Sequence, residues 1–166
     1  MKQLKVIFTL IAFSFILSAC GFQLRGKAQL PPEMNLTNLR INDQYSMFAR
    51  RVQVLLEQVG VQFVGTDQAT AILDIQQNDV LTEVLTIGDN ARVREYRISH
   101  TVRFRILAAN GKEIIPMQTL RQAREISFDE QQILAISREQ EYVKQDLADS
   151  LSRLLLSRIE VISMQS

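Results

Sequence analysis

The stretch RVREYRISHTVRFRIL, residues 92–107, decides the fold, because apolar and polar side chains alternate along most of its length. One side of the alternation holds Tyr96, Ile98, His100, Val102, Phe104 and Ile106, and the other holds Arg97, Ser99, Thr101, Arg103 and Arg105. A period of two is the side-chain period of a β-strand that buries one face. We therefore predict a long strand over residues 92–107, with His100 on its buried side.

Turn residues on both sides of this strand predict a meander of three antiparallel strands. Asn110-Gly111 is a strong two-residue hairpin signal, and a return strand should follow over residues 112–128. Pro116 lies inside that strand, which predicts an edge position or a bulge there. On the other side, Gly88-Asp89-Asn90 predicts a turn after a strand over residues 71–87, interrupted at 77–79 by a bulge.

Two stretches have helical periodicity. Residues 47–59 place apolar side chains on one face, after a short strand over residues 36–42; Asp43 or Ser46 is placed to cap this helix and Gly60 to end it. A last helix is predicted over residues 137–159, starting at a Ser137–Gln140 capping box. Its apolar stripe comprises Val143, Leu147, Leu151, Leu154 and Leu155, and on its outer face Asp149 can pair with Arg153.

This order of elements predicts an α+β fold. It reads strand, helix, three strands, helix, which suits a two-layer sandwich with both helices on one face of a mostly antiparallel four-stranded sheet. The strand–helix–strand start allows one parallel pair with a right-handed crossover. The chain has 166 residues, enough for one domain, which we place at residues 36–162 with a tail at 163–166.

The first 19 residues have the layout of a secretory signal peptide. Lys2 and Lys5 precede a run from Val6 to Leu17 that has no charge, and small residues follow. The run spans about 18 Å as a helix, shorter than the roughly 30 Å hydrocarbon core of a bilayer. We therefore predict a signal peptide over residues 1–19 that is cleaved, and not a permanent membrane helix.

Leu17-Ser18-Ala19-Cys20 resembles the lipobox of bacterial lipoproteins. In such proteins the signal is cut before the cysteine, which carries an S-diacylglycerol group and an N-acyl chain. Cys20 is the chain's only cysteine, so it has no partner for a disulfide and is free to serve as the anchor. Gly21 stands where aspartate often retains lipoproteins at the inner membrane, so the resemblance implies sorting to the outer membrane. Residues 20–35, punctuated by glycine and proline, are predicted to be a tether.

Catalytic, metal and nucleic-acid signals are weak. His100 is the only histidine, and its place among core-facing positions favours a buried, hydrogen-bonded side chain over a catalytic one. With no second histidine and the one cysteine lipidated, no metal-ligand spacing exists. Without the signal segment, 17 basic residues face 18 acidic ones, which argues against a nucleic-acid-binding protein. We predict no enzyme activity, no catalytic residues, no metal and no cofactor beyond the acyl groups on Cys20.

Arginines are concentrated on two neighbouring strands of the predicted sheet. They are Arg92, Arg94, Arg97, Arg103 and Arg105 on one strand, and Arg121 and Arg124 on the next. Guanidinium groups bind carboxylates and phosphates through paired hydrogen bonds. The alternative is a solvated face with cross-strand ion pairs, for example to Glu95 and Glu125. Spacing alone favours that alternative.

The chain resembles the LptE family of lipopolysaccharide-assembly lipoproteins. The resemblance begins at Cys20-Gly21-Phe22-Gln23-Leu24-Arg25 and continues through Glu95-Tyr96, the Asn110-Gly111 hairpin, residues 121–128, Arg138-Glu139-Gln140 and the last helix. It implies two helices on a four-stranded sheet and anchorage in the inner leaflet of the outer membrane. It also implies a periplasm-facing body that plugs the lumen of the β-barrel LptD, and insertion of lipopolysaccharide into the outer leaflet.

The resemblance further implies direct binding of lipopolysaccharide through basic residues near loop ends. Arg92, Arg94 and Arg138 are the candidates, facing lipid A phosphates or core-sugar carboxylates. Two alternatives remain open: a lipoprotein of another lipid-trafficking or envelope-assembly complex, and a lipid-anchored hydrolase that uses His100.

Overall fold

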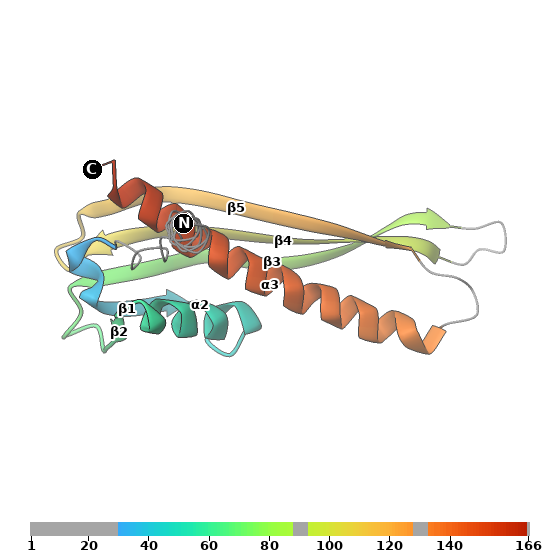
Figure 1. The fold of residues 1–166 in the computed structure, drawn as a ribbon, viewed down its shortest axis with the longest axis horizontal. Helices are drawn as coiled ribbons and strands as arrows, with labels where there is room; N and C mark the ends of the chain where they lie inside the picture. The colour runs from blue at the N-terminus through green and yellow to red at the C-terminus, as the bar shows by residue number, and fades with distance from the viewer. Residues whose placement is uncertain (1–29, 88–92, 128–132, 166) are drawn as a thin grey trace, which may run out of the picture.

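A twisted sheet runs the length of the molecule and carries two α-helices on one face (Figure 1). The computed structural model describes residues 30–87, 93–127 and 133–165. The predicted signal peptide lies outside them. The elements in chain order are η1 (Pro32–Asn35), β1 (Leu36–Ile41), α2 (Met47–Gln58), β2 (Gln62–Phe63), β3 (Ala71–Ile87), β4 (Val93–Ala108), β5 (Glu113–Ser127) and α3 (Ile133–Ser163).

The described sheet has five strands in the order β2-β1-β3-β4-β5. β1 is parallel to both β2 and β3, while β3, β4 and β5 form the predicted antiparallel meander. The α+β prediction is confirmed, and so is the parallel pair around the first helix. The predicted count of four strands is wrong by one, because β2 has only two residues and shows no periodicity to detect.

The hairpin between β4 and β5 forms where the sequence predicted it. Gly111 has a φ of +84°, a conformation that glycine adopts without a steric penalty, and its N–H donates to the carbonyl of Ala108 at 2.9 Å. β5 is an edge strand, and its pairing with β4 shifts register between Ile115 and Gln118. Pro116 lies in this irregularity, so both roles expected of it are present.

The main core lies between the sheet and the two helices. β4 supplies Val102, Phe104 and Ile106, all fully buried, which confirms the alternation of its sequence. α2 contributes Phe48, Val52 and Leu56 from the face that its periodicity predicted. α3 packs on β4, β5 and α2 and buries one long stripe. The buried side chains of that stripe are Val143, Leu147, Ala148, Leu151, Leu155 and Ile159.

A second, smaller apolar cluster lies under the N-terminal half of α3. Ile98 of β4 packs there with Val143 and Leu147, and Ile126 of β5 lies against them. We call this end of the molecule, where β3 ends and β4 and α3 begin, the distal end (Figure 1).

Several expected boundaries and contacts are corrected. α3 begins at Ile133, so Ser137 lies inside the helix and does not cap it. Leu154 is 36% exposed because it lies at the margin of the stripe, beyond the reach of the sheet. Asp149 pairs with Arg51 of α2 and not with Arg153. Within the segment expected to be a tether, Pro32–Asn35 form η1, and its Met34 is 1% exposed and packs in the core.

Burial of α3 against the sheet predicts a sharp contrast between two of its leucines. Leu151 is fully buried, so Leu151→Ala should lower the free energy of unfolding by about 2–5 kcal/mol through lost burial and the cavity left behind. Leu154→Ala, on the same helix, should cost about 1 kcal/mol or less. Urea unfolding followed by circular dichroism measures both, and equal losses would contradict this packing.

Candidate functional site

The structure places only part of the predicted binding set. Cys20 and Arg92 lie outside the described residues. Arg94 lies near the start of β4, and Arg138 lies near the start of α3 with an exposed side chain. Both elements begin at the distal end, so the fold brings Arg94 and Arg138 to the same end of the molecule (Figure 1).

Two arginines of β4 form ion pairs on the face of the sheet opposite the helices, which we call the open face. Arg97 Nη2 lies 2.6 Å from Glu125 Oε1 on β5, and this hydrogen bond raises the pKa of Arg97. Arg105 Nε lies 2.8 Å from Asp74 Oδ2 on β3, and this bond likewise raises the pKa of Arg105. For these two side chains, the interpretation as cross-strand pairs is confirmed.

The remaining arginines of the two strands differ in their surroundings. Arg103 and Arg121 are exposed on the open face and form no ion pair with another described residue. The pairs Arg103–Thr119 and Thr101–Arg121 make them diagonal neighbours. Arg124 faces the helices instead, and its Nη2 lies 3.1 Å from Asp146 Oδ2 of α3. The alternation of β5 separates Arg121 from Arg124, so the arginines of the two strands are divided between the two faces of the sheet.

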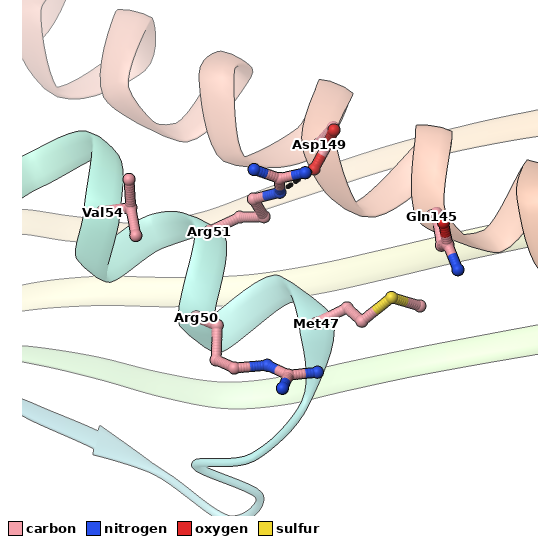
Figure 2. Close-up of a pocket in the computed structure, with 6 residues that line it drawn as sticks. All are labelled: Met47, Arg50, Arg51, Val54, Gln145 and Asp149. Atoms are coloured by element: carbon pink, nitrogen blue, oxygen red, sulfur yellow. Dashed lines mark ion pairs between the residues drawn. The ribbon is translucent and has the colours of Figure 1, made fainter.

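An open groove of about 270 Å³ lies between α2 and α3 (Figure 2). Arg51 points across it to Asp149, with Nε 2.5 Å from Oδ1, whereas Arg50 points away from that carboxylate. Its lining supplies guanidinium, thioether, amide, carboxylate and aliphatic groups, but no nucleophile next to a base. The lining residues are Met47, Arg50, Arg51, Val54, Gln145 and Asp149.

His100 is a core histidine with one hydrogen bond. It is 2% exposed, and its Nε2 lies 2.7 Å from Asn78 Oδ1 on β3. The Asn78 amide donates to Ser46 Oγ at 3.2 Å, and the same oxygen caps α2 by accepting from the N–H of Ala49 at 3.2 Å. The Phe48 ring meets the imidazole edge to face at 5.6 Å. This network ties two strands to the start of α2.

Burial lowers the pKa of His100, although the carboxylate of Asp79 acts in the opposite direction. The described residues place no nucleophile in hydrogen-bond contact with the imidazole, and its Nδ1 has no hydrogen-bond partner among them. The prediction of a buried, hydrogen-bonded histidine is therefore confirmed. The bulge predicted at 77–79 lies one step earlier, between Ile75 and Gln77, and Asn78 is regularly paired with Val102. Sequence reasoning assigned no role to Asn78, because an isolated asparagine gives no signal of its partner.

Neither metal ligation nor membrane crossing is found in the described parts of the chain. No three histidine, cysteine, aspartate or glutamate side chains there come close enough together to hold a metal ion. None of the helices formed by residues 30–87, 93–127 and 133–165 has the length and apolar character needed to span a bilayer.

A family model and two relatives that match this chain carry the same family name. The family model LptE, described as "Lipopolysaccharide-assembly", matches residues 36–159. LPS-assembly lipoprotein LptE of Pectobacterium atrosepticum is 25% identical over 161 residues, covering 95% of this chain and 86% of that protein. LPS-assembly lipoprotein LptE of Yersinia enterocolitica is 24% identical over 164 residues, covering 95% and 77%.

Two solved structures show the same fold. Lipoprotein B of Nitrosomonas europaea superposes with a TM-score of 0.70 at 23% identity, covering 87% of this chain and 93% of that one. The minor lipoprotein of Acinetobacter baumannii gives 0.66 at 21% identity, covering 79% and 94%.

The lowered pKa of His100 predicts a pH-dependent stability. Below about pH 6.5 the unfolded chain binds a proton at His100 that the native protein does not, so stability falls as pH falls. His100→Gln removes this titration and retains an N–H donor for Asn78. The stability of the wild type relative to this variant should fall as the pH falls below about 6.5, by at most about 1.4 kcal/mol per pH unit. Urea titrations at several pH values measure the difference, and a constant difference would contradict a neutral native imidazole.

Proposed function

Because its residues 36–159 match the family model, this chain belongs to the LptE family of lipopolysaccharide-assembly proteins, and we propose that it is an outer-membrane lipoprotein that works with the β-barrel LptD. In this role it binds lipopolysaccharide and takes part in its insertion into the outer leaflet. The match across the whole two-layer domain is the observation that carries the proposal. We propose no catalytic step, since assembly proceeds through binding.

The proposed anchor is Cys20. The lipobox Leu17-Ser18-Ala19-Cys20 supports cleavage before this residue and addition of S-diacylglycerol and N-acyl groups. Each buried methylene contributes about 0.8 kcal/mol to membrane binding, so several acyl chains give lasting attachment. The folded body then lies on the periplasmic side of the outer membrane, close to a barrel in the same membrane.

The surface of the body is suited to a place inside a barrel lumen. The interiors of wide outer-membrane barrels are polar. The open face offers them charged groups, and its pairs Arg97–Glu125 and Arg105–Asp74 are held between strands at 2.6 and 2.8 Å. Such pairs fix charged side chains in place without exposing a large apolar patch. These features support the proposed role as a plug.

Arg92, Arg94 and Arg138 are the proposed lipopolysaccharide contacts. Arg94 and Arg138 lie on elements that both start at the distal end, and Arg92 directly precedes β4 in the chain. Arg138 has an exposed side chain with no ion pair to another described residue. A guanidinium without an internal carboxylate is available for the phosphates of lipid A.

Loss of the anchor tests the proposed location and partner together. Cys20→Ser should abolish the lipid mass increment and release the protein from the outer-membrane fraction, as measured by mass spectrometry and fractionation. Purification of the tagged wild type should bring down the barrel LptD. The Leu154→Ala variant, which keeps Cys20, is the control. A wild-type protein that is lipidated and purifies without a barrel would contradict the proposed partnership.

Replacement of the proposed contacts tests lipopolysaccharide binding. The triple variant Arg92→Ala, Arg94→Ala, Arg138→Ala should raise the Kd for lipopolysaccharide by about tenfold or more, because each lost guanidinium removes a charge-assisted hydrogen bond. The effect should shrink at high salt. Arg103→Ala with Arg121→Ala, which removes two unpaired arginines from the middle of the open face, should leave the Kd near that of the wild type. Equal effects of the two variants would show that only net charge matters.

A further inference from the structure

The distal half of β3 has an unpaired edge within the described sheet. β1 ends at Ile41, opposite Ile75, whereas β3 continues to Ile87 with β4 as its only neighbour. Figure 1 shows β1 and β2 beside one end of β3 only. In an antiparallel pair, every second residue directs its N–H and C=O away from the partner strand. We call residues 77–86 the β3 edge.

The β3 edge keeps an unbroken register with β4 from Gln77 to Val84, and its register shifts fall on either side of that stretch, at Ile75/Gln77 and after Val84. The opposite edge, β5, contains Pro116 and a register shift, both of which hinder addition of another strand. The β3 edge has no proline and exposes Val80 by 45%, Leu81 by 54% and Val84 by 49%. A long edge with exposed aliphatic side chains is a ready template for strand addition.

Beyond Asn78, whose amide contacts Ser46 at the start of α2, the helices leave the β3 edge uncovered. α3 packs on β4 and β5, and α2 packs on α3 and β2. Val80 and Val84 pair with His100 and Tyr96, so they lie on the helix side of the sheet. Their exposure shows that the helical layer stops short of them. An added strand would therefore bury apolar side chains on that side.

Charge defines the other side of the edge. Asp79 and Glu83 lie opposite Thr101 and Arg97, on the open face, with Leu81 between them. Arg97 forms its ion pair with Glu125 and not with Glu83, and among the described residues Asp79 accepts a hydrogen bond only from the neutral amide of Gln77, at 2.8 Å. Neither carboxylate forms an ion pair with another described residue. The open side of the edge thus favours basic residues at alternate positions of an added strand.

Two other occupants fit less well. A second copy would bring its own Asp79 and Glu83 to the same side, and like charges on adjacent strands are destabilising. The chain's own Arg25 and Lys27 have the right charge, but Leu30 lies near the start of β3, because Thr70 Oγ1 binds the carbonyl of Glu33. Asp79 is about 30 Å further along the strand, whereas the five residues from Leu30 to Arg25 reach about 17 Å.

We propose that the β3 edge is a β-augmentation site that accepts one extended segment of a partner protein, with Lys or Arg beside Asp79 and Glu83 and apolar residues beside Val80 and Val84. Main-chain hydrogen bonds supply the binding, and the alternating side chains supply the selectivity. The inference goes beyond the proposed function, since it specifies a binding mode and holds whether or not that partner is a barrel.

Two peptides of opposite charge test the proposal. The full lipoprotein in nonionic detergent micelles is titrated with capped Lys-Val-Lys-Val-Lys-Val and with capped Glu-Val-Glu-Val-Glu-Val, and amide exchange is followed by NMR. The lysine peptide should slow exchange at outward-pointing amides of residues 77–86. It should bind about tenfold tighter than the glutamate peptide at low salt, and by a smaller ratio at high salt.

Variants of the two carboxylates complete the test. Asp79→Lys with Glu83→Lys should reverse the peptide preference. Asp79→Asn with Glu83→Gln, which preserves side-chain volume, should abolish the preference and provides the answer if the reversed variant fails to fold. Glu57→Lys with Glu141→Lys, at two exposed helix positions that form no ion pair with another described residue, makes the same change in net charge and is the control that should leave the preference unchanged.

Four results would overturn the proposal. These are absence of binding at millimolar peptide, protection of β5 or of the α2–α3 groove in place of the β3 edge, protection of the edge that rises with protein concentration alone, and protection of the edge by the chain's own residues 20–29. The last two would identify a second copy and the N-terminal segment, respectively, as the occupant.

Discussion

The double pairing of β4 is the constraint on which the rest of the structure depends. This strand is paired with β3 on one side and β5 on the other along most of its length, so its alternation is imposed on the whole sheet. A slip by one residue would move Phe104 to the open face and bring Arg103 or Arg105 into the core, which fixes the register strongly. The helices then have one apolar face to cover, and the charged side chains have one open face on which to pair.

Polar groups inside this framework are held by short chains of hydrogen bonds. His100, Asn78 and Ser46 link β4, β3 and the start of α2, so the position of a helix depends on a strand pair that lies beneath it. On the open face, Asp74 has a side chain only 8% exposed and is held by Arg105. Low local polarity strengthens such contacts and makes their loss costly. These hydrogen-bonded polar groups thus help to fix how the helices pack on the sheet.

Short-range sequence patterns predicted the features that depend on neighbouring residues. The period of β4, the Asn110-Gly111 turn and the buried His100 follow from side-chain alternation and backbone preference, and each is confirmed. The predicted start of α3 at Ser137 was wrong, because a serine and a glutamine three residues apart also occur inside helices.

Contacts between elements that are far apart in the chain could not be predicted from the sequence. The pairing of Asp149 with Arg51 depends on how two helices cross. The division of Arg121 from Arg124 depends on strand parity, and the free β3 edge depends on where β1 ends relative to β3. Of the proposed lipopolysaccharide contacts, the fold supports the shared end of Arg94 and Arg138. The roles of these arginines and of Cys20 still rest on the proposal.

The sheet is narrower at its distal end, and this affects where the molecule unfolds locally. The end where β1 and β2 lie beside β3 is five strands wide and contains the main core, whereas the distal end is three strands wide and rests on the small cluster of Ile98, Val143 and Leu147. Separate clusters open with separate free energies, and the smaller one opens first. The distal end can therefore loosen and re-form while the remainder stays folded. Such a molecule is rigid at its five-stranded end and flexible at its distal end.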